Sequence, residues 1–247
     1  MSTAPDTRHI LTAAYDTLLA HYGPQRWWPY HVGGVWEVMI GCVLTQHTQW
    51  SNVELSLGNL MAVWGPDALA RPELVLDAPV EPLSAMLRPT GFYSTKPQRL
   101  KDLAAYVLSK GGPETYRNST EPTSTLRDEL LTIKGIGPET ADAILLYGLD
   151  RPVYVGDAYS GRLAARWGLL PLGASYHTVR ALFMDNLPHD AALFNEYHAL
   201  VVRHARTICR PRARCQVCPL GRIVPLGHNP GAWECPRLYT ARKESAP

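Results

Sequence analysis

A Gly-Ile-Gly turn between two helical stretches is the feature that most constrains the fold of this chain. Apolar residues recur at helical spacing on both sides of it: Leu126, Leu130 and Ile133 within residues 124–133, and Ala141, Ile144 and Leu145 within residues 139–149. Only a tight turn fits between these stretches. Gly135 and Gly137 permit a positive φ and leave no Cβ in the way of a ligand, and Pro138 suits the first turn of a helix. The sequence therefore predicts a helical hairpin.

The turn of this hairpin can bind an anion. The free N–H groups at the start of the second helix point outward and, together with the helix dipole, form an anion site. The natural anion is a nucleic-acid phosphate, a contact that positions the partner without reading its sequence. The alternative is an ordinary helix–turn–helix corner with glycine caps, because turns of this kind are common.

An aspartate, Asp157, opens the next helical stretch, Ala158 to Leu163. One interpretation is that Asp157 is only an N-cap, worth about 0.5–2 kcal/mol. The other is chemical: a carboxylate at this position can stabilise a developing cation or activate water. The two roles are compatible, because a helix N-terminus favours the ionised carboxylate.

Four of the five cysteines lie near the C-terminus with the spacing C-x5-C-x2-C-x16-C: Cys209, Cys215, Cys218 and Cys235. Four thiolates suit either a [4Fe–4S] cluster or a structural Zn²⁺. Two disulfides are the alternative, although nothing in the sequence indicates secretion. Cys235 is separated from the others by a long gap, so His204 or His228 could replace it as a ligand. The fifth cysteine, Cys42, lies in an apolar run and is expected to be a buried small hydrophobe.

Arginines surround the first of these cysteines. Six occur between residues 201 and 222, where there is no acidic residue: Arg203, Arg206, Arg210, Arg212, Arg214 and Arg222. A run of charge is usually a solvated face. When a metal-bound loop holds such a run of arginines in place, we interpret it as a phosphate-binding surface. Arg210, Arg212 and Arg214 are therefore DNA-binding candidates. The metal site would have a structural role.

Composition limits the remaining possibilities. A chain of 247 residues can form one large or two small domains, and its hydrophobic content of 46% supports a real core. The net charge of +2 is too small to indicate a DNA-binding protein by itself. No segment approaches the ~20 apolar residues of a membrane span, and the N-terminus lacks a signal-peptide core. We expect a cytoplasmic, helical protein with helices around residues 10–18, 100–107 and 194–201.

The string Leu-x-x-Ile-Lys-Gly-Ile-Gly-Pro-x-Thr-Ala-x-x-Ile, from Leu130 to Ile144, resembles the helix-hairpin-helix of DNA glycosylases of the endonuclease III superfamily. The resemblance implies that Asp157 is catalytic and that Lys134, Gly135 and Gly137 contact DNA. Bifunctional members carry a lysine two residues past the second glycine, where this chain has Glu139, and Lys134 on the other side of the turn is a poor substitute. This difference predicts a monofunctional enzyme with weak or absent AP-lyase activity.

A second stretch, Val43 to Trp50, resembles the loop with which these enzymes fill the gap left by a flipped base. Gln46 matches the intercalating glutamine, and His47 is the neighbouring candidate. The segment Trp27-Trp28-Pro29, the aromatic Trp50 and the stretch from Thr90 to Leu100 resemble the 3-methyladenine glycosylase branch, in which aromatic residues sandwich the base. Taken singly, each aromatic is more simply explained as core. An alkylated purine is cationic, however, so electron-rich rings attract it, and it leaves readily without a general acid.

The resemblance extends from Arg26 to Thr240 and implies an all-α fold of two helical domains. Residues 29–144 would form a six-helix barrel that includes the hairpin. Residues 1–28 and 145–247 would form a domain bearing a C-terminal [4Fe–4S] loop, and DNA would lie across the cleft between the domains. The cysteine spacing departs from the family, which has six residues in the first gap and five in the last, and the 3-methyladenine branch generally lacks these cysteines.

We therefore expect a monomeric, nucleoid-associated DNA glycosylase that removes alkylated purines from double-stranded DNA. Two alternatives stay open at this point. One is an endonuclease III-like glycosylase and AP lyase for oxidised pyrimidines. The other is a DNA-binding homologue with weak or lost catalysis.

Overall fold

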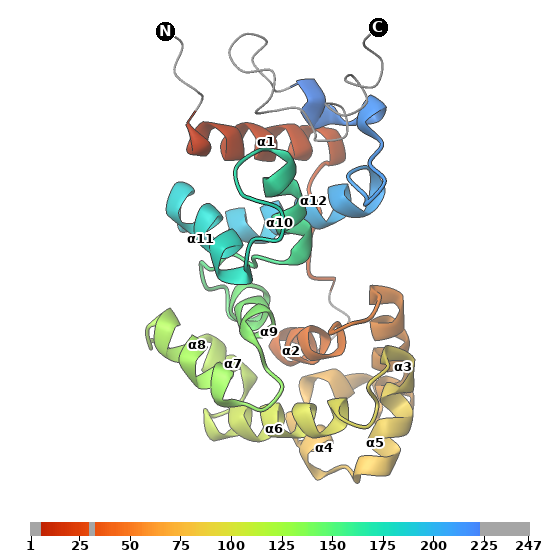
Figure 1. Cartoon of the computed structure of the whole chain (residues 1–247). Helices are drawn as coiled ribbons and strands as arrows, with labels where there is room; N and C mark the ends of the chain where they lie inside the picture. The colour runs from red at the N-terminus through yellow and green to blue at the C-terminus, as the bar shows by residue number, and fades with distance from the viewer. Residues whose placement is uncertain (1–5, 30–32, 223–247) are drawn as a thin grey trace, which may run out of the picture. The chain divides into compact units, whose positions relative to one another are not determined.

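Helices make up the regular structure of the described part of the chain, residues 6–29 and 33–222 of the computed structural model (Figure 1). No strand occurs in those two ranges, so the predicted all-α class is confirmed. The chain divides into two units. The discontinuous unit comprises Met1–Trp27 and Val153–Pro247, and the continuous unit comprises Trp28–Pro152. Residues 145–152 thus pack with the unit that contains the Gly-Ile-Gly turn. None of the helices in the described ranges has the length and apolar character needed to cross a membrane.

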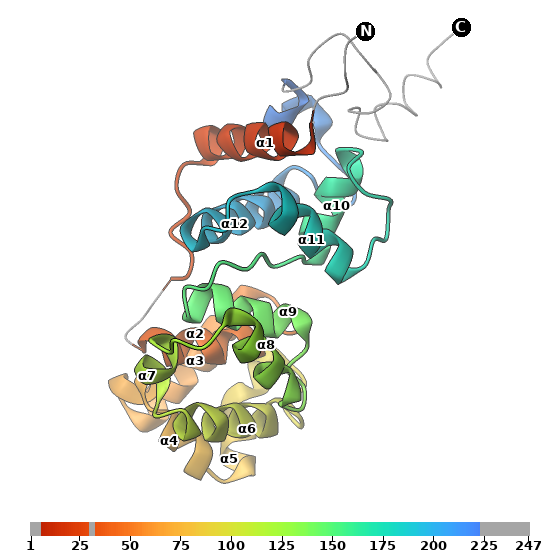
Figure 2. The ribbon, with the colours of Figure 1, turned by 90° about the vertical axis from the view of Figure 1, so that its left-hand side faces the viewer.

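The discontinuous unit is built around α12, which packs against α10 and α1 (Figures 1 and 2). Its elements are α1 (Thr7–Tyr22), α10 (Ala158–Arg166), α11 (Tyr176–Asn186), α12 (Ala191–Thr207), and two short 3-10 helices, η4 (Cys215–Val217) and η5 (Pro219–Arg222). Aromatic rings form much of its core: the Tyr154 ring stacks on the Phe183 ring at 3.9 Å, and the ring of Tyr197 packs edge-on against both. This core holds the start of α10 against α12.

The continuous unit surrounds α2 (Gly34–Leu44), which is buried from Val35 to Leu44. Its other elements are α3 (Trp50–Trp64), η1 (Pro66–Ala70), α4 (Pro72–Asp77), α5 (Val80–Leu87), η2 (Arg88–Thr90), α6 (Lys96–Ser109), α7 (Pro113–Arg117), α8 (Thr123–Thr132), α9 (Pro138–Ala143) and a π-helical turn, η3 (Ile144–Gly148). Because α2 is apolar apart from Glu37, its neighbours bury it from Val35 to Leu44. The loop that follows α2 is therefore anchored in the core at its N-terminal end.

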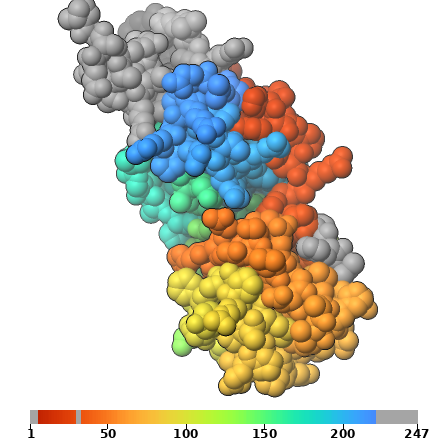
Figure 3. Space-filling model, turned by 90° about the vertical axis from the view of Figure 1, so that its right-hand side faces the viewer, coloured from red at the N-terminus to blue at the C-terminus, as the bar shows by residue number. Residues whose placement is uncertain are grey.

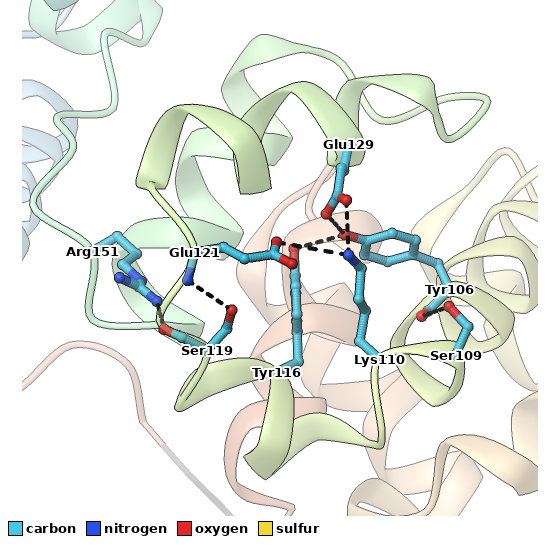
Figure 4. A network of polar contacts seen from close by, with 8 residues as sticks. All are labelled: Tyr106, Ser109, Lys110, Tyr116, Ser119, Glu121, Glu129 and Arg151. Carbon is cyan, nitrogen blue, oxygen red and sulfur yellow. Dashed lines mark hydrogen bonds and ion pairs between the residues drawn. The ribbon is translucent and has the colours of Figure 1, made fainter.

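Helix α8 is fastened to α6 and α7 by a polar network (Figure 4). The Tyr106 hydroxyl donates to Glu129 Oε2 at 2.6 Å and contacts the Tyr116 hydroxyl at 3.3 Å. The Lys110 ammonium lies 2.8 Å from Glu129 Oε1 and 3.7 Å from Glu121 Oε2. Burial raises the pKa of Tyr116 to about 12, so both tyrosines remain hydroxyl donors at neutral pH. The network fixes the helix that leads into the Gly-Ile-Gly turn.

The helices expected around residues 10–18, 100–107 and 194–201 are α1, α6 and α12. Proline marks several helix starts, as Pro72, Pro113 and Pro138 occupy the first position of α4, α7 and α9. The expected second helix of the hairpin differs from the simple prediction. It is α-helical only to Ala143 and continues to Gly148 as a π-helical turn, a distortion that is frequent at functional sites.

Candidate active site and DNA-binding elements

The hairpin consists of α8, the turn at residues 133–137, and α9. The Ile136 side chain is buried, whereas Lys134, Gly135 and Gly137 are exposed at the tip. Gly135 has φ +88°, and a Cβ there would lie 2.4 Å from Arg99 Nε. Glycine is thus required at this position both by the backbone conformation and by the arginine that crosses it. The turn exposes its backbone as the sequence predicts for an anion site, and its binding of phosphate stays a prediction.

A buried ion pair joins the two helices of the hairpin. Arg127 of α8 donates from Nε to Asp142 Oδ1 at 2.7 Å and from Nη2 to Oδ2 at 3.2 Å. The Asp142 side chain is fully buried, and that of Arg127 is 17% exposed. Because this pair is bidentate and enclosed, it sets the angle at which α9 leaves the turn.

Gln46 connects the loop after α2 to the hairpin turn. Its Nε2 donates to the Gly135 carbonyl at 3.0 Å and to Thr140 Oγ1 at 2.9 Å. Its Oε1 accepts from Arg99 Nη1 at 2.6 Å. Each polar atom of the amide therefore has a partner, and in this structure Gln46 braces the two loops that the sequence assigns to DNA.

His47 is the exposed residue of the same loop, and it adopts φ +55°. Its ring lies 5.5 Å from the ring of Phe92, centroid to centroid. Phe92 also has a positive φ, +47°, and is 55% exposed. Such conformations are uncommon for bulky residues and persist only where the surroundings impose them. The two aromatic side chains form an exposed pair, which we call the tip pair.

Lys96 holds the two loops that carry the tip pair. Its side chain is fully buried, and Nζ donates to the carbonyls of Leu44 and Thr90, each at 2.8 Å. Those carbonyls end α2 and η2, immediately before the loops of His47 and Phe92. Burial, with the nearby charge of Arg99, lowers the pKa of Lys96 to about 8.

Aromatic rings gather on one side of α2. The Trp28 ring packs edge-on against Trp50, 4.9 Å between centroids, and lies 5.6 Å from the ring of Tyr147. A Cβ on Gly41 would meet the Trp28 ring at 2.3 Å, so glycine in α2 makes room for the indole. Trp28 is 6% exposed, Trp50 is half-buried and Pro29 is exposed. Trp27 belongs to the discontinuous unit, so the structure describes a cluster of Trp28, Trp50 and Tyr147.

Asp157 is the N-cap of α10, and its Oδ1 accepts from the Ser160 N–H at 2.8 Å. Its Oδ2 lies 3.4 Å from His198 Nε2 of α12. Both residues are 8% exposed. Burial raises the pKa of the Asp157 carboxyl, but the charge of His198 and the hydrogen bonds from His198 and Ser160 outweigh it, so the pKa lies below its ordinary value. The structure thus shows the predicted cap together with a carboxylate kept ionised while buried.

Three of the four predicted metal ligands are described. Cys209 follows α12 and is buried, and its Sγ accepts from Arg166 Nη1 at 2.9 Å. Cys218 Sγ lies 3.5 Å from Nε2 of His204. Cys215 begins η4, and Cys235 lies outside the described residues, as does His228. Within the described ranges, no three His, Cys, Asp or Glu side chains are placed to hold a metal ion.

His204 has partners at both ring nitrogens. Nδ1 lies 3.0 Å from the Tyr22 hydroxyl, and Nε2 faces Cys218. Burial, together with the charge of His21, lowers the pKa of His204 to about 4. With a neutral ring and the tyrosine hydroxyl at Nδ1, Nε2–H can donate to the Cys218 sulfur. N–H donors therefore face two of the predicted ligand sulfurs, an arrangement that suits thiolates bound to a metal.

Two arginines of α10 donate hydrogen bonds to backbone carbonyls at the start of the loop that follows Cys209. Arg162 and Arg166 donate to the Cys209 carbonyl, each at 3.0 Å, and Arg166 also donates to the Arg210 carbonyl at 2.9 Å. Arg210, Arg212 and Arg214 are exposed. In Figure 3 the blue segment that includes this loop lies at the surface next to α1, in red. The loop therefore presents its guanidinium groups outward.

The structure brings some predicted residues together and adds others. Gln46 meets the hairpin turn, and Trp28 meets Trp50, whereas Asp157 and the cysteines belong to the other unit. Pattern reasoning missed six side chains that now have clear positions: Phe92, Lys96, Arg99, Thr140, Tyr147 and His198. Phe92, Lys96 and Arg99 lie within the stretch from Thr90 to Leu100 that carried the resemblance, but no single-sequence signal distinguishes His198 from other histidines.

Comparison with known proteins identifies the family. The pattern described as "HhH-GPD superfamily base excision DNA repair protein" matches residues 40–189. A "putative DNA repair glycosylase" of Methanocaldococcus jannaschii is 40% identical over 207 residues, which are 83% of this chain and 91% of that protein. The H. pylori 3-methyladenine DNA glycosylase bound to 1,N6-ethenoadenine superposes with a TM-score of 0.67 at 28% identity, covering 82% of this chain and 98% of that one.

An endonuclease III–DNA complex shares the fold, with a TM-score of 0.71 at 20% identity over 91% of this chain and 96% of that one. The resemblance to the endonuclease III superfamily is confirmed by these matches. The chain therefore belongs to the HhH-GPD superfamily, and it is a base excision repair DNA glycosylase.

Proposed function

We propose that this enzyme removes alkylated purines such as 3-methyladenine from double-stranded DNA by hydrolysis of the N-glycosidic bond. Asp157 is the residue on which the proposal depends. Its carboxylate is buried yet has a pKa below the ordinary value, so it carries a negative charge in a region where charge interactions are strong. That charge stabilises the oxocarbenium-like sugar as the base departs, and the carboxylate can orient the attacking water.

The cluster of Trp28, Trp50 and Tyr147 is proposed to receive the flipped base. Electron-rich rings attract a cationic alkylated purine, and such a base needs no general acid to leave. Trp28 is buried against Gly41 and suits the floor of the pocket, whereas the half-buried Trp50 suits a wall. The similarity to the 28% identical H. pylori 3-methyladenine DNA glycosylase, bound to 1,N6-ethenoadenine, supports a purine substrate.

Binding of damaged duplex DNA is proposed to use three elements. The exposed turn with Lys134, Gly135 and Gly137 would contact backbone phosphates. The tip pair would fill the gap left by the flipped base, with Gln46 beside it. The exposed Arg210, Arg212 and Arg214 would contact phosphates further along.

We propose that the enzyme is monofunctional. Glu139 is exposed in the first turn of α9, at the position where bifunctional members of the family carry the lysine that forms a Schiff base. A carboxylate cannot form that adduct. Lys134 lies on the other side of the turn, where it would contact a backbone phosphate.

A [4Fe–4S] cluster is proposed to be bound by Cys209, Cys215, Cys218 and Cys235, with Zn²⁺ as the alternative metal. The N–H groups of Arg166 and His204 that face two of these sulfurs support thiolate ligands. A bound cluster would supply a rigid structural centre for the basic loop. Iron and sulfide analysis of the purified protein, with its visible absorption spectrum, distinguishes the cluster from zinc.

A panel of duplexes tests the substrate and the absence of lyase activity together. Each duplex carries one lesion and is incubated with enzyme, and strand breaks are measured with and without alkali. Breaks at an alkylated purine that require alkali are expected. Alkali-independent breaks at thymine glycol would instead identify an endonuclease III-like lyase, and tight binding with no base release would identify a non-catalytic homologue.

A further inference from the structure

Asp157 has a partner whose role the proposed chemistry does not yet include. One carboxylate oxygen, Oδ1, caps α10 by accepting a hydrogen bond from the Ser160 N–H at 2.8 Å. The other oxygen, Oδ2, lies 3.4 Å from His198 Nε2. His198 is on α12, a helix that reaches Asp157 only through the packing of α10 on α12. The imidazole therefore belongs to the tertiary structure around the carboxylate and not to its local turn.

We infer that His198 is a positioning residue for Asp157: its Nε2 lies 3.4 Å from Oδ2 and holds the carboxylate in the orientation that the reaction needs. This inference rests on the proposed function, because it assigns a role within the same site. His198 does not itself touch the substrate in this account. It acts through the carboxylate, as the hydrogen-bond partner of an active-site group commonly does.

The surroundings define the orientation of the imidazole. The Tyr154 ring packs against that of His198 at a centroid distance of 6.0 Å and an interplanar angle of 80°. Tyr154 is itself held by stacking on Phe183, 3.9 Å between centroids, and by its hydroxyl, 3.1 Å from Ser160 Oγ. Since the Ser160 N–H donates to Asp157, the N-cap, the tyrosine links the histidine and the aspartate through one connected set of contacts.

Charge from other elements does not replace this partner. On α10, the Arg162 guanidinium lies over the Tyr159 ring at 5.2 Å and donates to the Cys209 carbonyl. On α11, a Cβ at Gly156 would lie 2.6 Å from the Arg180 backbone nitrogen, so this helix packs closely against the residue before Asp157. The His198 imidazole lies within 4.0 Å of the Asp157 oxygens, and its charge lowers the pKa of that carboxyl.

The physical consequence is a carboxylate that stays ionised and correctly oriented in a buried site. Burial alone favours the protonated acid, and a protonated Asp157 has no charge with which to stabilise the sugar cation. The His198 imidazole beside Oδ2 favours the ionised form and opposes the effect of burial. Removing the imidazole should therefore leave burial as the dominant influence and move protonation of Asp157 to higher pH.

The test measures the carboxylate directly in the intact protein. With [4-13C]aspartate labelling, the Asp157 carboxyl resonance is assigned by its disappearance in Asp157→Asn and is followed with pH in wild type, His198→Gln and His198→Phe. In His198→Phe its midpoint is expected to rise by roughly one unit or more, because one hydrogen bond to a charged group is worth about that much. His198→Gln keeps an N–H near the position of Nε2 and should lie between the other two. His177→Phe removes an exposed histidine from α11 and serves as the matched control.

Base release from an alkylated duplex under single-turnover conditions supplies the second measurement. As the pH is lowered, the rate of His198→Phe should begin to fall about one pH unit above the point at which the wild-type rate falls, in proportion to the shifted midpoint. An unchanged Asp157 midpoint in both His198 variants, with folding verified by circular dichroism, would overturn the inference. A shifted midpoint combined with full base release by Asp157→Asn would uphold the pair and instead reject the catalytic role of Asp157.

Discussion

The ion pair between Arg127 and Asp142 makes a strong prediction about what holds the hairpin together. Replacing Arg127 with methionine keeps the length of the apolar stem but removes both hydrogen bonds to a fully buried carboxylate. Breaking a buried pair by removing one partner costs about 3–5 kcal/mol, because the remaining carboxylate loses its guanidinium partner. For a chain of this size, that loss lowers the unfolding temperature by roughly 6–20 °C.

A surface pair of the same chain provides the matched control. Arg117 and Asp150 also form an ion pair, but their side chains are 40% and 56% exposed. Exposed pairs contribute about 0–1 kcal/mol, so Arg117→Met should be close to wild type. The double variant Arg127→Met/Asp142→Leu removes both charges and should be more stable than Arg127→Met alone.

Urea unfolding gives the free energies, and amide hydrogen exchange in α8 and α9 shows whether the loss is located at the hairpin. Equal free energies of unfolding for Arg127→Met and Arg117→Met would refute the reasoning. So would a double variant less stable than the single one, because the cost would then arise from lost packing and not from an uncompensated charge.

Three further predictions concern the two units separately. Gly135→Ala should destabilise the protein and weaken duplex binding more than Gly173→Ala. Both glycines have a positive φ, but only a Cβ at Gly135 would meet Arg99. Thermal unfolding and a duplex-binding titration test this prediction, and equal effects of the two substitutions would contradict it. The pKa of Lys96 is about 8 in the folded protein and 10.5 ordinarily. Between these two pH values the unfolded chain therefore binds more protons than the folded protein. The free energy of unfolding of wild type, relative to that of Lys96→Met, should rise with pH across this range in urea titrations. Cys209→Ser should lower the iron content per chain, and full retention of iron would remove Cys209 from the ligand set.

Local sequence patterns were enough for the elements whose contacts are local. The apolar spacing predicted α1, α6, α8 and α12, and the aspartate before residue 158 predicted a cap whose hydrogen bond the structure contains. The Gly-Ile-Gly turn required glycine at Gly135, where φ is +88°. In each case the physical cause lies within a few neighbouring residues, which a sequence displays directly.

Contacts between distant segments could not be predicted in this way. Gln46 and Gly135 are 89 positions apart, so the bracing role of that glutamine depends on how α2 packs in the continuous unit. His198 meets Asp157 only because α12 packs on α10. The positive φ of Phe92 has no signal in residue type, since bulky aromatic residues rarely adopt it. Tertiary packing imposes these features, and the chain alone does not reveal them.

The most direct test of the account compares two aspartates that cap helices in the same way. Asp157 accepts from the Ser160 N–H at the start of α10, and Asp190 accepts from the Leu193 N–H at the start of α12. Asparagine preserves capping at both positions, so the substitutions differ in which carboxylate is lost. Release of 3-methyladenine from alkylated duplex DNA, measured in single turnovers, should fall by at least about a hundredfold in Asp157→Asn with duplex binding retained, and should be unchanged in Asp190→Asn. Equal rates of release in Asp157→Asn and wild type would contradict the central claim.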